Sequence, residues 1–131
     1  MGIKNQHTKC NGKDVQTSAI KQIKDAYLFT SGLYFDEPQI RKGLELLKEK
    51  SRYYRLGGDC YMYGMLASGL IDIVLEDTLK VHDYMALVNV IEGAGGIVTD
   101  KHGNSVTINS EGSILATANK TLHNQVIDII N

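Results

Sequence analysis

The sequence has only two cysteines, one proline and no long apolar run. Cys10 and Cys60 lie far apart in the chain, a spacing that does not suggest a disulfide scaffold and leaves a reducing compartment as the expectation. No apolar run approaches the roughly 20 residues that a membrane-spanning helix needs. The N-terminus also lacks the charged-then-apolar layout of a secretory signal. The sequence therefore predicts a cytoplasmic protein without a membrane segment.

Strong net charge and zinc-type histidine spacing are absent as well. The net charge of −1 gives no indication of binding to nucleic acid or to an anionic membrane. The four histidines have no pairwise zinc spacing, and we treat them as non-ligands: His7, His82, His102 and His123. A length of 131 residues, with 43% hydrophobic and 22% charged residues, is typical of one soluble globular domain. We expect that domain over residues 10–131, after a frayed or disordered segment 1–9.

Apolar periodicity alternates between strand and helix along the chain. Strands are expected at residues 26–31, 52–56, 71–75, 97–99 and 114–118. Helices are expected at residues 38–50, 59–68, 83–93 and from 119 to the end. The polar N-terminal part has a turn at Asn11-Gly12 and a possible short strand up to Thr17-Ser18. Because helices separate the strands, the sequence predicts a layered α/β/α domain with helices on both faces of the sheet.

One stretch places a carboxylate at the start of an apolar helix. Between Asp83 and Glu92 nearly every side chain is apolar, which is typical of a helix that lies inside a domain. The helix dipole and the free N–H groups favour negative charge at this end, and an ionised Asp is a natural ligand for a hard cation such as Mg²⁺. An N-cap role for Asp83 explains the local pattern at least as well.

Three motifs follow one another at fixed spacing and carry a family resemblance. They are Gly57-Gly58-Asp59-Cys60-Tyr61, Lys80-Val81-His82-Asp83 and Glu92-Gly93-Ala94-Gly95-Gly96. Together they resemble the C-terminal half of the inositol monophosphatase-like, Mg²⁺-dependent phosphatases, and the first two most resemble the histidinol-phosphatase branch. The resemblance extends from about Cys10 to the end of the chain. It implies a mixed sheet of about five strands between helices, and a phosphorylated small-molecule substrate.

The resemblance also implies roles for particular residues. Asp83 would ligate one Mg²⁺ ion. The turn formed by Gly57, Gly58 and Asp59, together with Glu76 at the end of the next strand, would hold the non-phosphate part of the substrate. The residues alone leave alternatives open, because Asp59 suits a capped tight turn and Glu76 suits a solvated strand end.

Arg55 and the tyrosines are less specific signals. Arg55 is a candidate partner for a phosphate or carboxylate, and an ordinary surface arginine is at least as good an interpretation. Four tyrosines are more typical of core and interface aromatics than of a stacking platform: Tyr53, Tyr54, Tyr61 and Tyr63.

Motifs from the family's N-terminal half do not occur in these residues. That half supplies most metal ligands, through a Gly-Glu-Glu-like loop and an Asp-Pro-x-Asp-Gly-Thr motif, whereas Pro38 here lies between Glu37 and Gln39. We therefore expect the substrate-binding and partial metal-binding portion of a phosphomonoesterase of the histidinol phosphate or inositol phosphate type. It would be inactive alone, because its N-terminal half is either separately encoded or missing from this sequence. A degenerate remnant of a split gene and a repurposed protein-interaction module are the alternatives. Apolar area and a strand edge left open would favour a homo-oligomer.

Overall fold

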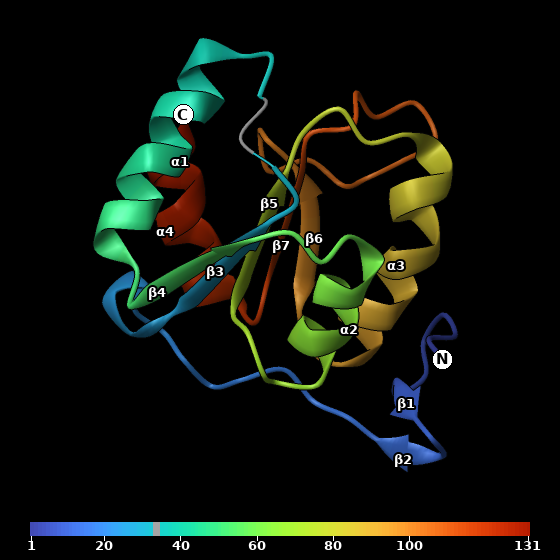
Figure 1. Cartoon of the computed structure of the whole chain (residues 1–131). Helices are drawn as coiled ribbons and strands as arrows, with labels where there is room; N and C mark the ends of the chain where they lie inside the picture. Colours follow the sequence, from blue (N-terminus) through green and yellow to red (C-terminus); the bar gives the residue numbers. More distant parts are fainter. Residues whose placement is uncertain (33–34) are drawn as a thin grey trace.

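The computed structural model describes residues 1–32 and 35–131 and arranges them around one mixed sheet (Figure 1). Within the described residues this sheet has five strands: β3 (Tyr27–Thr30), β4 (Tyr53–Leu56), β5 (Ile73–Glu76), β6 (Ile97–Asp100) and β7 (Ile114–Thr117). Their order across the sheet is β4-β3-β5-β7-β6. Strand β3 runs parallel to β4 and β5, whereas β7 runs antiparallel to β5 and β6. The predicted mixed, five-stranded sheet is confirmed.

Helices cover both faces of the sheet, as predicted. The α-helices of the described chain are α1 (Pro38–Lys50), α2 (Cys60–Ala67), α3 (Val81–Gly93) and α4 (Lys120–Ile130). Helices α1 and α4 lie together on one face, and α2 and α3 lie on the other (Figure 1). A proline opens α1, where its ring-restricted backbone suits the first helical turn, and two lysines in the last turn interact favourably with the carbonyl end of the helix dipole. The side-chain oxygen of Asn119 caps α4 by accepting the N–H of Leu122.

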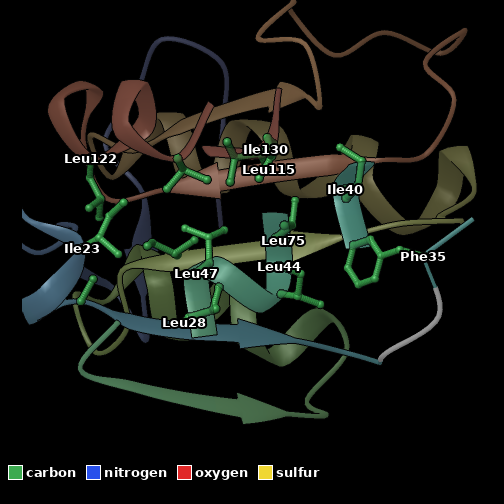
Figure 2. Close-up of a cluster of buried hydrophobic side chains, with 13 residues drawn as sticks. Ile23, Leu28, Phe35, Ile40, Leu44, Leu47, Leu75, Leu115, Leu122 and Ile130 are labelled. Atoms are coloured by element: carbon green, nitrogen blue, oxygen red, sulfur yellow. The ribbon is translucent and has the colours of Figure 1, made fainter. Parts of the chain in front are cut away.

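The sheet divides the apolar core into two clusters, because successive side chains of a strand point to opposite faces. One cluster joins the sheet to α1 and α4, and its sheet residues include Leu28, Leu75 and Leu115 (Figure 2). The adjacent residues on the same strands belong to the second cluster, beneath α2 and α3: Phe29, Val74, Ile114 and Ala116. Each strand of this central group is therefore buried on both sides.

Helix α3 differs from its prediction in where it begins and how deeply it lies. It begins at Val81, with Lys80 as the N-cap, rather than at residue 83. We expected a buried helix, but only Tyr84 and Ile91 of its side chains are fully buried, and Ala86 is exposed. The prediction was wrong because α3 is the outermost layer on its face of the sheet. Its apolar composition therefore does not make it a core helix.

The N-terminal segment folds against α3 and the sheet. Strands β1 (Lys9–Cys10) and β2 (Lys13–Asp14) form a hairpin around the predicted Asn11-Gly12 turn. We expected residues 1–9 to fray, but Thr8 is buried, and its hydroxyl donates to the carbonyl of Val90 at 2.7 Å.

Two local features differ from the predicted secondary structure. The short strand predicted up to Ser18 does not form, because Thr17 bonds instead to the backbone carbonyls of Ala94 and Ala118. A 3₁₀ turn at Ile23–Asp25 was not predicted. No helix in residues 1–32 and 35–131 is long and apolar enough to cross a lipid bilayer.

Candidate functional site

A cavity of about 670 Å³ opens beside the carboxyl ends of β3 and β5. Because these strands are parallel neighbours, the residues that end them meet at the same edge of the sheet, the edge at which open α/β sheets bind ligands. The N-terminal ends of α2 and α3 complete its wall. The lining includes Thr30, Ser31, Asp59, Cys60, Tyr63, Glu76, Asp77, His82 and Asp83.

Asp83 is the third residue of α3 and lines the cavity. Its Oδ2 accepts the backbone N–H of Lys80 at 2.8 Å, so this oxygen caps the helix. Its Oδ1 lies 3.5 Å from Nε2 of His82, and the side chain is 44% exposed. The expectation that Asp83 is itself the N-cap was wrong in position. Capping occupies one carboxylate oxygen, and the other remains at the cavity.

The glycine turn before α2 presents Asp59 to the cavity. Three successive residues have positive φ angles, 86° at Gly57, 129° at Gly58 and 45° at Asp59, and such angles are uncommon for a non-glycine residue. The N–H of Gly57 donates to the carbonyl of Thr30 at 2.8 Å and ties the turn to the end of β3. Asp59 precedes α2, but its side chain makes no capping hydrogen bond, so the capped-turn interpretation was wrong. Gly57 and Gly58 shape the turn, and Asp59 contributes to the lining.

Glu76, the last residue of β5, is buried at the cavity and only 4% exposed. Its Oε2 accepts the hydroxyl of Tyr63 at 2.6 Å, and its Oε1 accepts the hydroxyl of Ser31. The solvated strand-end interpretation was wrong, because β5 lies in the middle of the sheet with helices over both faces. Burial, and then the negative charge of Glu76, raise the pKa of the Tyr63 hydroxyl well above 10. Tyr63 is therefore a neutral donor to the carboxylate.

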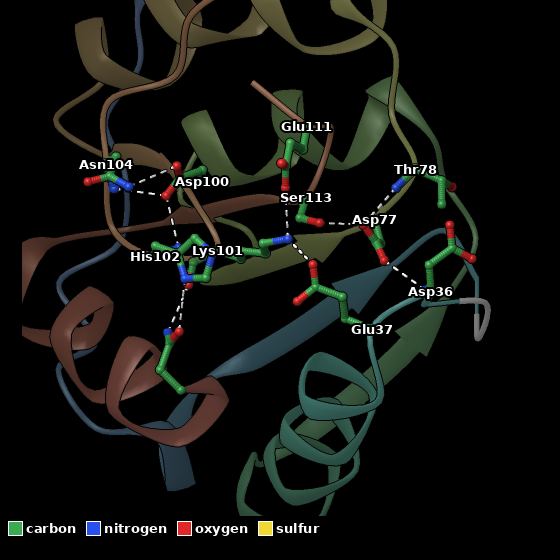
Figure 3. Close-up of polar contacts among 11 residues, drawn as sticks. Asp36, Glu37, Asp77, Thr78, Asp100, Lys101, His102, Asn104, Glu111 and Ser113 are labelled. Carbon is green, nitrogen blue, oxygen red and sulfur yellow. Dashed lines mark hydrogen bonds and ion pairs between the residues drawn. The ribbon is translucent and has the colours of Figure 1, made fainter. Parts of the chain in front are cut away.

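Asp77, the residue after Glu76, holds loops together. Its Oδ2 accepts the N–H of Asp36 at 2.9 Å, while its Oδ1 accepts the N–H of Thr78 at 2.9 Å and the hydroxyl of Ser113 (Figure 3). Three donors thus engage this carboxylate, which makes it a structural group rather than the first candidate ligand in the cavity.

An ion cluster around one buried lysine lies beside this junction. Lys101 is 5% exposed and pairs with Glu37, the residue that precedes α1, and with Glu111 at 3.1 Å (Figure 3). The hydrogen bond to Glu37 raises the pKa of Lys101 above its ordinary value, although burial opposes the shift. The cluster fixes α1 against the end of β6, outside the cavity lining.

The donors at the cavity fit a hard cation only in part. Mg²⁺ prefers oxygen ligands, usually one or two carboxylates together with substrate phosphate and water, and Asp83 offers one such carboxylate. In residues 1–32 and 35–131, no three His, Cys, Asp or Glu side chains are arranged to hold a metal ion. Arg55 is exposed on the edge strand β4 and does not line the cavity. The structure thus brings together Asp59, Glu76 and Asp83 and leaves Arg55 apart.

Sequence reasoning missed the two hydroxyl groups that hold Glu76. Tyr63 lies four residues after Asp59, a spacing that puts both on one face of a helix, and this signal could have placed it beside the cavity. Ser31 directly follows β3, but its partner depends on the strand order. His82 was excluded as a ligand, and the structure places it at the cavity beside Asp83.

The sequence model of the inositol monophosphatase family matches residues 1–131, and the chain belongs to that family. It is 33% identical over 135 residues to the chloroplastic bifunctional phosphatase IMPL2 of Arabidopsis thaliana, covering 98% of this chain and 39% of that protein. It is 30% identical over 121 residues to the histidinol-phosphatase of Chlorobaculum parvum, covering 92% and 46% respectively. The predicted family is confirmed.

Solved structures agree with this assignment. An inositol monophosphatase from Zymomonas mobilis superposes with a TM-score of 0.94 at 33% identity, covering 98% of this chain and 51% of that one. The Thermotoga maritima IMPase TM1415 superposes with a TM-score of 0.83 at 20% identity, which shows the shared fold alone. The chain spans about half the length of these relatives or less.

Proposed function

We propose that this chain is the substrate-binding and partial metal-binding portion of a Mg²⁺-dependent phosphomonoesterase. The observation that carries the proposal is that Asp59, Glu76 and Asp83, which come from three separate elements, line one cavity at the carboxyl edge of the sheet. Relatives named as histidinol-phosphatase and inositol monophosphatase support a substrate of one of these two phosphate types.

The chemistry divides between the metal and the side chains of this chain. A bound Mg²⁺ would polarise the phosphate and lower the pKa of a coordinated water, and Asp83 would hold it through Oδ1. Glu76 and Asp59 would bind the non-phosphate part of the substrate. The turn of residues 57–59 holds Asp59 in place before a substrate arrives. The hydroxyl groups of Tyr63 and Ser31, which donate to Glu76, do the same for its carboxylate.

The remaining metal ligands are proposed to come from protein outside residues 1–131. The sequence lacks the Asp-Pro-x-Asp-Gly-Thr motif that the family resemblance assigns to metal binding and water activation. By itself the chain would hold Mg²⁺ weakly and would not turn over a phosphomonoester. We further propose that it acts in the cytoplasm and that, without that protein, it associates with a second copy.

Paramagnetic NMR tests the metal role directly. Mn²⁺, added with inorganic phosphate to the ¹⁵N-labelled chain, is expected to broaden the amide signals around residues 80–84 first. Asp83→Asn keeps a side chain that can cap the helix, and it should remove this localised broadening. Asp128→Asn, on the exposed side of α4, is the matched control and should leave the pattern unchanged. Broadening that survives in Asp83→Asn, or that centres elsewhere, contradicts the proposal.

A further inference from the structure

Lys101 bridges two segments that are far apart in the chain. It is 5% exposed, and its ammonium group donates to Glu37, just before α1, and at 3.1 Å to Glu111, in the loop before β7 (Figure 3). An ammonium group has three donors and no acceptor, so one lysine can hold both carboxylates at once. Charge-assisted hydrogen bonds of this kind are about twice as strong as neutral ones. Lys101 therefore fastens the loop before β7 to the start of α1.

Asp77 makes a second bridge between the same two segments. Its Oδ2 accepts the N–H of Asp36 at 2.9 Å, and its Oδ1 accepts the hydroxyl of Ser113 (Figure 3). These two donors lie next to, or close in sequence to, the carboxylates that Lys101 holds. Asp77 itself belongs to the loop that leads from β5 into α3. Three segments of the chain thus meet at these two side chains.

A backbone contact between two of these loops makes the junction tight. The carbonyl of Gly112, in the loop before β7, accepts the N–H of Leu79 at 3.1 Å. Gly112 has a φ angle of 88°, which favours glycine, and a Cβ atom there would overlap the carbonyl oxygen of Leu79. The loop before β7 therefore lies directly against the loop before α3, and a shift of one must move the other.

Both sides of this junction form walls of the cavity. Asp77 and Asp83 line it from the loop and the helix that follow β5, and Phe35 lines it from the segment before α1. Lys80, the residue after Leu79, donates its N–H to Oδ2 of Asp83 at 2.8 Å. The position of Asp83 in the cavity therefore depends on where the loop before α3 is held.

We propose that Lys101 is a positioning residue that, through Glu111 and the junction at Asp77, holds the start of α3 and with it Asp83 in place beside the cavity. The inference rests on the proposed function, in which Asp83 is the metal ligand. The described lining of the cavity does not include Lys101, so Lys101 acts on Asp83 through the loops between them. Without its charged anchor the loop before β7 would loosen, and the loop before α3 would loosen with it.

Amide hydrogen exchange tests this coupling without any metal. Lys101→Met removes the charge and keeps a long side chain, and it should make the amides of Leu79 and Lys80 exchange about tenfold faster. The amide of Val74, in the central strand β5, should change by less than about twofold, because the sheet does not depend on the bridge. Lys101→Arg keeps the charge and should restore most of the protection. Lys42→Met, exposed on α1, is the matched control.

Metal binding provides a second readout. The Mn²⁺ concentration that half-broadens the amide signals of residues 80–84 should rise about threefold in Lys101→Met and return toward the wild-type value in Lys101→Arg. Glu111→Gln, at a side chain that is 80% exposed, tests the same bridge if Lys101→Met fails to fold. Unchanged exchange at Leu79 and Lys80 in the folded variants, or equal acceleration at Val74, overturns the proposal. If the wild type shows no localised broadening, the proposed function fails, and the exchange data alone decide this inference.

Discussion

Acidification should destabilise this fold through one buried histidine. His123 on α4 is 5% exposed, and its ring nitrogens lie 2.9 Å from the hydroxyls of Thr99 and Thr117. Burial lowers its pKa from 6.5 to about 4. The folded protein therefore keeps this imidazole neutral at pH values where the unfolded chain binds a proton. Stability from this group is complete above pH 6.5 and is lost progressively as the pH falls toward 4.

The size of the effect follows from proton linkage. The full shift corresponds to roughly 3 kcal/mol, and at pH 5 about 2 kcal/mol of it should already be lost relative to pH 8. Urea unfolding at pH 8, 6.5, 5.5 and 5 measures the free energy of unfolding along this range. His123→Asn should lower stability at pH 8 and flatten the slope below pH 6.5, since it removes the buried titrating group.

An exposed histidine variant and a direct titration complete the design. His7→Asn removes an exposed imidazole and should leave the acid-induced loss at its wild-type size. In the NMR spectrum, the ring signal of His123 should stay in its neutral position down to about pH 5. A His123 signal that titrates near pH 6.5, or an equal acid-induced loss in His123→Asn, would refute the reasoning.

Three further predictions concern the site and the surface. The isolated chain with millimolar Mg²⁺ should hydrolyse neither histidinol phosphate nor inositol monophosphate above background in a phosphate-release assay, because the family's water-activating groups are not in the sequence; turnover that depends on Asp83 contradicts this. Mg²⁺ near its dissociation constant should add only about 0.4 kcal/mol, so thermal melts with and without it should differ by a degree or two, and a large shift abolished by Asp83→Asn would reveal a complete metal site. The edge strand β4, with exposed Tyr53, Tyr54 and Leu56, predicts self-association, which size-exclusion chromatography with light scattering can follow with dilution; a 14.5 kDa monomer at high micromolar concentration excludes it.

Local signals predicted the secondary structure better than they predicted burial. Helix α1 runs from Pro38 to Lys50 as expected, because a first-turn proline and terminal lysines mark both ends in the sequence. The predicted burial of α3 was wrong. How much of a helix is buried depends on which other elements pack against it, and the sequence of the helix alone does not reveal this. The environment of Glu76 was equally hidden, because it follows from the central place of β5 in the strand order.

In the candidate site, too, the sequence predicted which residues take part but not all of the contacts between them. The family resemblance implied Asp59, Glu76 and Asp83, and the structure places them around one cavity. The bond from Tyr63 to Glu76 requires α2 to pack over the end of β5, which is a property of the tertiary structure. Arg55 was predicted as a site residue and does not belong to the cavity. It is close in sequence to the turn of residues 57–59, but it lies on the edge strand β4.

The hydrogen bond from the Lys80 N–H to Asp83 couples the start of a helix to the proposed metal ligand. An aspartate that must be ordered upon metal binding loses side-chain entropy at that step. Here the cap has already ordered the carboxylate, and rotating it away would sacrifice a bond worth about 1 kcal/mol. The chain thus holds the proposed ligand in place before any metal binds. Protein that supplies the other proposed ligands would meet one carboxylate already held in place.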